Sequence, residues 1–104
     1  MVYLCLLVRF FKVFSAMTKG NSHPFHKHGE AWIGQVHGRK LWWFLPPETQ
    51  PIPEKVNACD YLTGKVPIPE GAFTSLQEPG DFMWLPKNWY HATCALEDWS
   101  VGVG

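Results

Sequence analysis

Glycine and proline recur at short intervals along the chain, and this spacing limits the possible folds more than any other feature. The runs between them are short and rich in aromatic and β-branched residues, and none has the 3.6-residue period of a long amphipathic helix. This pattern is typical of an all-β domain built from many short strands. We expect eight strands, at residues 12–17, 24–28, 31–37, 40–45, 73–77, 81–85, 90–96 and 99–103.

The length of the chain allows one hydrophobic core. It has 104 residues, of which 46% are hydrophobic and 15% aromatic, which is enough to fill one small barrel and too little for a second domain. We therefore expect a single domain over residues 1–104. Residues 46–71 contain six prolines, which block strand pairing. They predict a surface insertion between two halves of the sheet, either functional or a plain spacer, with one helical turn at 57–62.

Charge and hydropathy argue against two classes of partner. Nine basic residues balance nine acidic ones, so the chain as a whole does not attract nucleic acids or anionic lipids. The apolar run at residues 2–8 is interrupted by Arg9 and Lys12, well short of the roughly 20 residues that a spanning helix needs. Positive charge follows this run, whereas a signal peptide carries it before the apolar part. We expect a buried first strand, or the remnant of a larger protein.

The cysteines predict a reducing environment. Cys5, Cys59 and Cys94 are an odd number at wide, irregular spacings, which fits neither a disulfide framework nor a paired-cysteine metal site. The expected location is therefore intracellular, in the cytoplasm or nucleus.

The first group of chemically active side chains lies near residue 28. His26, His28 and Glu30 occupy alternate positions, so in an extended segment all three would leave the same face. Imidazole and carboxylate are ligands that Fe(II), Mn(II) and Zn(II) accept, and such a set leaves positions open on the metal. The alternative is a pair of strand histidines on a solvated face.

The second group lies near residue 91. Pro86 ends one predicted strand and Asn88 is suited to a turn, so His91 falls at the start of the next strand, where it would face the barrel interior with Thr93. Alone, His91 would be interpreted as an ordinary core residue. Together with the upstream His-x-His segment, it becomes a candidate ligand. The nearby aromatics Trp84, Trp89 and Tyr90 are expected to be core or rim residues.

These residues carry a resemblance to a known family. Gly20 precedes His26-Lys27-His28 by the spacing of the first cupin motif, and Gly80, Pro86 and His91 have the spacing of the second. The stretches FHKHGEAWIGQVHGRKLWWFLPPE and PGDFMWLPKNWYHATCALEDWSVGVG resemble Jumonji C (JmjC) hydroxylases in the order and spacing of their landmarks. Together they cover about half of the chain. The sequence thus resembles a JmjC domain, a branch of the cupin superfamily.

The resemblance implies an all-β fold, a double-stranded β-helix (cupin or jelly-roll) barrel of eight strands. Here the barrel would be minimal, without the helices that usually frame it, and a truncated gene product is one interpretation. Active members use Fe(II) and 2-oxoglutarate. Their metal is held by His-x-Asp/Glu and a distal His, and a lysine two residues after a glycine binds the far carboxylate of 2-oxoglutarate. In this chain that glycine is Gly38 and the lysine is Lys40. A solvated basic turn with Arg39 is the alternative role for Lys40.

The sequence departs from the family pattern at three places. His26 falls at the first ligand position, so His28 stands where the acid belongs. The metal would then be held by three histidines, or Glu30 would supply the carboxylate by a shift of register. His23 replaces a hydroxyl residue that often contacts 2-oxoglutarate, and Ala95 replaces a common Asn. These departures bear on co-substrate binding more than on metal binding.

Our leading hypothesis is an Fe(II)/2-oxoglutarate-dependent oxygenase, a JmjC-type hydroxylase or demethylase acting on a protein or another macromolecule. The metal ligands would come from His26, His28, Glu30 and His91, and Lys40 and His23 would contact 2-oxoglutarate. Two alternatives stay open: a non-catalytic metal-binding module of the same fold, and a cupin-type dioxygenase that does not use 2-oxoglutarate. The expected partner is a protein or peptide substrate, with no nucleic-acid patch and no membrane.

Overall fold

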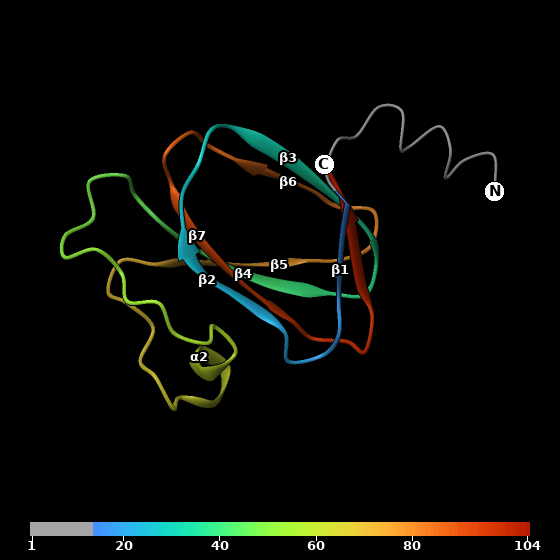
Figure 1. The fold of residues 1–104 in the computed structure, drawn as a ribbon, viewed down its shortest axis with the longest axis horizontal. Helices are drawn as coiled ribbons and strands as arrows, with labels where there is room; N and C mark the ends of the chain where they lie inside the picture. The colour runs from blue at the N-terminus through green and yellow to red at the C-terminus, as the bar shows by residue number, and fades with distance from the viewer. Residues whose placement is uncertain (1–13) are drawn as a thin grey trace.

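The chain folds into two antiparallel sheets of four strands each. The structure, a computed structural model, describes residues 14–104. The elements are β1 (Phe14–Met17), β2 (Ser22–His26), β3 (Ala31–His37), β4 (Lys40–Leu45), α2 (Asp60–Thr63), β5 (Phe73–Gln77), β6 (Phe82–Leu85), β7 (Tyr90–Ala95) and β8 (Ser100–Val103). One sheet has the order β1-β8-β3-β6 and the other β2-β7-β4-β5, and the two face each other (Figure 1). The predicted all-β, cupin-like fold class is confirmed.

Strand positions agree closely with the prediction, with one informative exception. β3, β4 and β5 have the predicted bounds, and the expected first strand begins with two residues outside the described part. β2 lies two residues earlier than predicted and contains Pro24 within it rather than at its start. Because β2 is an edge strand, the missing N–H of Pro24 costs no interior ladder bond. The pairing of β2 with β7 is irregular between His23 and His26.

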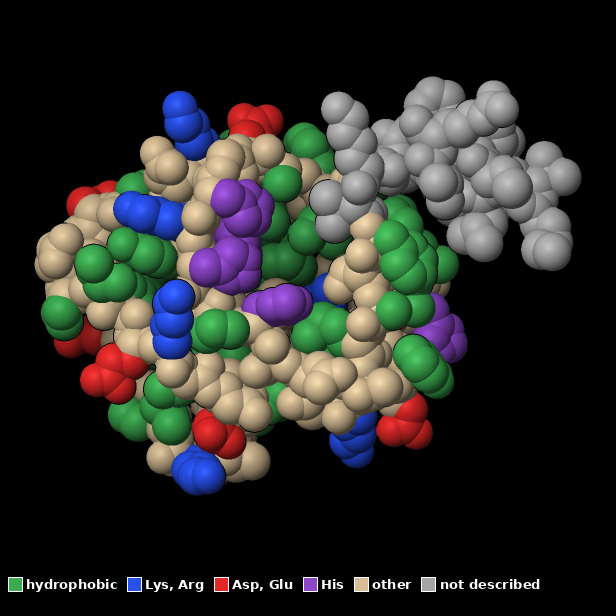
Figure 2. Space-filling view, viewed as in Figure 1, with side chains coloured by type: hydrophobic (Ala, Val, Ile, Leu, Met, Phe, Trp, Pro, Cys, Tyr) green, Lys and Arg blue, Asp and Glu red, His purple; other side chains and the backbone are tan. Residues whose placement is uncertain are grey.

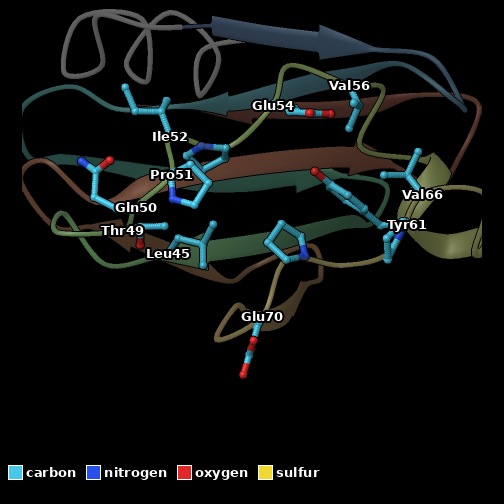
Figure 3. A pocket seen from close by; sticks show the side chains of 13 residues that line it. Leu45, Thr49, Gln50, Pro51, Ile52, Glu54, Val56, Tyr61, Val66 and Glu70 are labelled. Carbon is cyan, nitrogen blue, oxygen red and sulfur yellow. The ribbon is translucent and has the colours of Figure 1, made fainter.

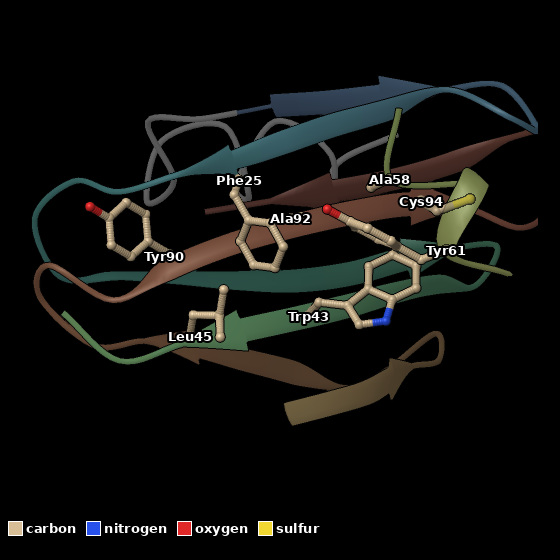
Figure 4. Close-up of a cluster of buried hydrophobic side chains, with 8 residues drawn as sticks. All are labelled: Phe25, Trp43, Leu45, Ala58, Tyr61, Tyr90, Ala92 and Cys94. Atoms are coloured by element: carbon tan, nitrogen blue, oxygen red, sulfur yellow. The ribbon is translucent and has the colours of Figure 1, made fainter. Parts of the chain in front are cut away.

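The proline-rich insertion covers the outer face of one sheet. It joins β4 to β5, which are neighbours in the same sheet, so the expectation that it connects two halves of the sheet is wrong. α2 and the turn before it contribute Ala58 and Tyr61 to a buried cluster with Trp43 from β4 (Figure 4). The helical turn is one turn long, as expected, but lies about two residues later than predicted. Its apolar residues therefore complete the core on that side.

A disulfide fixes the insertion to the sheet. Cys59, next to α2, is bonded to Cys94 in β7, so the expectation that the cysteines form no disulfide is wrong. The two residues are 35 positions apart and meet only because α2 packs on the outer face of β7, where Cys94 points. An odd cysteine count therefore gives no argument about the redox compartment, and the location in the cytoplasm or nucleus stays a prediction. Cys5 lies outside the described residues.

The insertion also forms a pocket of about 420 Å³, which is lined by Tyr61 and by prolines from both arms of the loop (Figure 3). Burial, followed by the charge of Glu54, raises the pKa of the Tyr61 hydroxyl. This pocket lies on the outer side of the sheet, so it is separate from the barrel interior.

The side chain of Gln77 joins the two sheets inside the barrel. The indole Nε1 of Trp42 donates to Oε1 of Gln77 at 2.8 Å, and Nε2 of Gln77 donates to the carbonyl of Ile33 in the opposite sheet at 2.8 Å. Gln77 is fully buried, so these bonds replace those it would make with water. The network shows that Trp42 and its alternate neighbours Lys40 and Phe44 face the interior.

None of the helices within residues 14–104 has the length and apolar character needed to cross a bilayer.

Candidate metal centre

Three histidines, from two neighbouring strands and the loop after one of them, meet at one end of the barrel. His26 is the last residue of β2, His28 lies in the loop after it, and His91 is the second residue of β7. Antiparallel pairing places His26 directly opposite His91. One ring nitrogen from each of the three lies within 4.8 Å of the others. Figure 2 shows histidine side chains gathered on this face, over the region where β2 and β7 lie in Figure 1.

Backbone carbonyls orient all three rings in the same way. Nδ1 of His26 is 2.8 Å from the carbonyl of Pro24, Nδ1 of His28 is 2.7 Å from that of Gly29, and Nδ1 of His91 is 3.2 Å from that of Trp89. Because a carbonyl only accepts, Nδ1 must carry the proton in each bond. Each Nε2 then keeps its lone pair, which is the usual arrangement of metal-binding histidines.

The electrostatic surroundings of His91 favour the neutral form of its imidazole ring. Burial, followed by the nearby His26, lowers the pKa of His91 to about 4, against a smaller opposing effect of its bond to Trp89. The ring is therefore neutral at physiological pH. Metal binding requires neutral imidazole, so no proton has to be displaced from His91.

The turn between β6 and β7 positions the loop that carries His28. Asn88 has φ of 65°, the left-handed conformation that asparagine tolerates better than most residues, and so forms the turn that the sequence predicts. Its backbone N–H donates to the carbonyl of His28 at 3.0 Å. The segment before β7 therefore supports the ligand loop as well as leading into His91.

Glu30 is not brought together with the histidines. β2 ends at His26 and β3 begins at Ala31, so the segment between them is not extended and strict alternation of side chains does not hold there. Glu30 is exposed and lies outside the group formed by His26, His28 and His91. Of the four predicted ligands, the structure thus gathers the three histidines.

Lys40 lies in the barrel interior. Its side chain is 3% exposed, which does not fit the alternative of a solvated turn, whereas Arg39 beside it is exposed and pairs with Glu97. The Lys40 ammonium lies 5.5 Å from the ring centre of Trp42, and no described carboxylate forms an ion pair with it. Burial accordingly lowers the pKa of Lys40.

Strand alternation predicts that Thr93 faces the barrel interior, but the sequence indicates no role for it. Its hydroxyl is buried and has no hydrogen-bond partner among the described residues. Thr93 lies opposite His23 in β2 and opposite Trp42 in β4, two residues from His91. Alternation along β7 predicted its direction, but only the packing of both neighbouring strands shows that the hydroxyl is left unpaired.

His23 lies beside this group at the edge of the sheet. It is exposed, and its ring centre is 6.0 Å from that of His26. Partial burial, followed by His26 and Lys40, lowers the pKa of His23. His23 is paired with Thr93 in β7, so these two side chains leave the sheet on the same face.

Comparison with known proteins agrees with this geometry. The sequence model of the JmjC domain matches residues 4–104, nearly the whole chain. The chain belongs to the JmjC domain family. The predicted family is therefore confirmed.

Several curated JmjC proteins are similar to the chain. JmjC domain-containing protein 8 of Homo sapiens is 31% identical over 83 residues, which is 75% of this chain and 31% of that protein. Arginine-specific demethylase JMJ20 of Arabidopsis thaliana is 29% identical over 93 residues, 77% of this chain and 20% of that protein. The 2-oxoglutarate and iron-dependent oxygenase JMJD4 of Mus musculus is 25% identical over 95 residues, 77% of this chain and 22% of that protein. The chain thus spans less than a third of the length of these JmjC relatives.

Proposed function

We propose that the protein is an Fe(II)- and 2-oxoglutarate-dependent oxygenase that acts on a side chain of a protein substrate. The observation that carries the proposal is the buried ammonium group of Lys40, which has no anionic partner among the described residues. It shares the interior with the unpaired hydroxyl of Thr93. Thr93 lies on β7, which also carries His91, and Lys40 lies on the neighbouring strand β4.

The chemistry of these two groups fits a dicarboxylate. A buried charge without a partner is costly, and so is a buried hydroxyl that makes no hydrogen bond. A carboxylate bound in the interior would pair with the Lys40 ammonium and accept a bond from the Thr93 hydroxyl. The other carboxyl end of 2-oxoglutarate would then be available to the metal that the histidines would hold.

His26, His28 and His91 would hold the metal. Iron and 2-oxoglutarate, when bound, supply the oxidation of a substrate C–H bond by O₂. The protein contributes imidazoles that are already oriented by backbone carbonyls, and the stacked aromatic rings of Trp42 and Phe44 beside them.

The relatives support the same class of chemistry. The mouse relative is named as a 2-oxoglutarate and iron-dependent oxygenase, and the Arabidopsis relative as an arginine-specific demethylase. A protein side chain is therefore the substrate class that we propose for this chain, either hydroxylated or demethylated.

The decisive experiment is anaerobic titration of the purified chain with Fe(II) and then 2-oxoglutarate. We expect a weak visible charge-transfer band on addition of 2-oxoglutarate. Lys40→Ala should abolish the band while Fe(II) affinity is retained, and Lys65→Ala, at an exposed site in the insertion, should leave both unchanged. Metal binding without a band in the unmodified chain would reject the proposal.

The three-histidine shell favours one alternative, a dioxygenase of the same fold that does not use 2-oxoglutarate. His28 stands where the family has an acid, and Glu30 lies outside the group. Glu30→Ala tests the shell directly: we expect unchanged Fe(II) affinity, whereas a loss of about tenfold or more, roughly 1.4 kcal/mol, would place Glu30 among the ligands. A metal-bound chain in which 2-oxoglutarate and Lys40→Ala have no effect would support the alternative or a non-catalytic module.

A further inference from the structure

A second pocket lies on the open seam of the barrel. β5 is the last strand of one sheet and β6 the last strand of the other, and the pocket of about 250 Å³ lies between them. We call it the aromatic pocket. It is lined by Phe44, Phe73, Met83, Trp84, Pro86 and Trp89, with Ser75 as its polar side chain.

The lining indicates what the pocket accepts. Four of its residues are aromatic, and no charged side chain from the described part of the chain lines it. Phe73 is nevertheless 62% exposed and Trp84 is 49% exposed, so large apolar side chains around the pocket face water. Clustered exposed aromatics of this kind mark binding sites more often than single exposed residues do.

The pocket lies close to the candidate metal centre along one row of paired residues. His26 lies opposite His91, His91 opposite Phe44, and Phe44 opposite Phe73, so one cross-strand row runs from the histidines into the pocket. Neighbouring strands are about 4.8 Å apart, which places Phe73 two strands, or about 10 Å, from His91.

Aromatic side chains also contact one another between the histidines and the pocket. The rings of Trp42 and Phe44 are stacked with their centres 5.7 Å apart, and the ring of Trp42 lies 6.0 Å from that of His91. At the far end, the ring of Phe73 is 6.3 Å from that of Trp89. A polypeptide with one residue at the metal would therefore bring a neighbouring side chain to the pocket.

We propose that the aromatic pocket binds a large apolar side chain of the polypeptide substrate, next to the residue that is oxidised. This inference rests on the proposed function and adds a sequence preference to it. It also assigns Trp84 and Trp89 a role in substrate contact, whereas their sequence context predicts core or rim residues.

Other occupants fit less well. A charged side chain would lose its hydration without finding an opposite charge in the lining. A second copy of the chain would need an interface of roughly 800 Å² on each partner, far more than a pocket that holds one side chain. Its volume is also below the roughly 300–1,000 Å³ of sites for drug-sized molecules.

The probe for the test is N-acetyl-phenylalanine amide, added to the ¹⁵N-labelled chain while the tryptophan indole N–H signals are followed by NMR. We expect saturable shifts of the Trp84 and Trp89 signals with a dissociation constant on the order of 1 mM, typical of a single small group. N-acetyl-lysine amide should bind at least fivefold more weakly. Equal binding of the two probes, or no saturable shift, would overturn the inference.

Two phenylalanines form a matched pair for mutation. Phe73 and Phe82 are each 62% exposed and lie on the two edge strands, but only Phe73 lines the pocket. Phe73→Ala should weaken binding of the phenylalanine probe at least threefold, Phe73→Leu should restore part of it, and Phe82→Ala should leave it unchanged. Equal weakening by Phe73→Ala and Phe82→Ala would show that the probe binds elsewhere.

Manganese tests the link to the metal centre. With Mn(II) bound at the histidines, the ring protons of the bound probe should broaden strongly, and His91→Ala should remove this effect. If the ring-proton signals of the bound probe are not broadened, the pocket does not lie close to the metal centre and the inference is rejected. The Fe(II) and 2-oxoglutarate band is measured on the same sample: a band without probe binding rejects this inference alone, and absence of the band rejects the proposed function.

Discussion

At the scale of single residues, Lys40 favours binding of a dicarboxylate but lowers the stability of the ligand-free chain. Its ammonium group is almost fully buried, and among residues 14–104 its favourable contact is with the ring of Trp42. A bound dicarboxylate would relieve this cost. The residue most important for the proposed function should therefore be unfavourable for the free chain.

Lys40→Met tests this conflict. We expect the free energy of unfolding of the ligand-free chain to rise by about 1–3 kcal/mol, because an apolar side chain replaces an unpaired buried charge. Stabilisation of the chain by 2-oxoglutarate should be lost at the same time. Urea unfolding with and without 2-oxoglutarate measures both effects. Lys65→Met is the exposed control, with an expected change within about 0.5 kcal/mol. A destabilised Lys40→Met variant would mean that the lysine has a structural partner.

Substitutions of Asn88 test whether the turn between β6 and β7 supports the candidate metal ligand His28. Its φ of 65° suits asparagine and glycine but not a β-branched residue. Asn88→Val should cost about 1–3 kcal/mol of stability and lower metal affinity, because the N–H of residue 88 would no longer hold the carbonyl of His28. Asn88→Gly keeps the backbone conformation and should retain metal affinity. Isothermal titration with Mn(II) measures the difference, and equal affinities in both variants would contradict the supporting role.

The sequence predicted several of these residues and missed others for a clear reason. His91 and Lys40 follow from motif spacing and strand alternation, which are local properties. Thr93 could be placed on a face in the same way, but its unpaired hydroxyl depends on what β2 and β4 place beside it. Glu30 was predicted by extending the alternation past His26, and the chain leaves the extended conformation at that point.

At the scale of elements, the site depends on the pairing of β2 with β7. These strands are far apart in the sequence, and their register places His26 opposite His91. The other face of β7 is covered by the insertion, where Cys94 is bonded to Cys59. One strand therefore carries a candidate metal ligand, His91, on its inner face and an anchor for the insertion, Cys94, on its outer face.

The disulfide gives a prediction for these two faces. The double variant Cys59→Ser and Cys94→Ser should lose about 2–4 kcal/mol of stability, the usual contribution of a crosslink. Its metal affinity should stay within about threefold, because the cysteine and histidine side chains leave β7 on opposite faces. Thermal melts with and without dithiothreitol measure the first effect, and the double variant should not respond to the reductant. A large loss of metal affinity would show that the insertion also holds His91 in position.

At the scale of the whole molecule, a metal ion would act as a crosslink within the barrel. It would join the β2 edge, the loop after it and the central strand β7. Binding to the folded chain alone stabilises it by an amount set by concentration and affinity, about 2.7 kcal/mol when free metal is 100 times the dissociation constant.

Metal addition should therefore raise the melting temperature of the chain. We expect Mn(II) to do so in the unmodified chain and in His37→Ala, whose histidine is exposed and outside the group of three. His91→Ala should remove the response, and EDTA should reverse it. A response that survives His91→Ala would place the metal elsewhere.

The sequence by itself determined the class of fold, the approximate strand positions and the two motifs that carry the histidines. These depend on local properties: glycine and proline spacing, strand alternation, and the distance between residues of a motif. The tertiary structure decided which side chains meet. It brought His28 rather than Glu30 to His91, and it joined Cys59 to Cys94. It also buried the Lys40 ammonium without an ion pair, and the Thr93 hydroxyl without a hydrogen bond, to any residue that the structure describes. These outcomes depend on strand register and on the packing of the insertion, which involve residues far apart in the chain and leave no local pattern in the sequence.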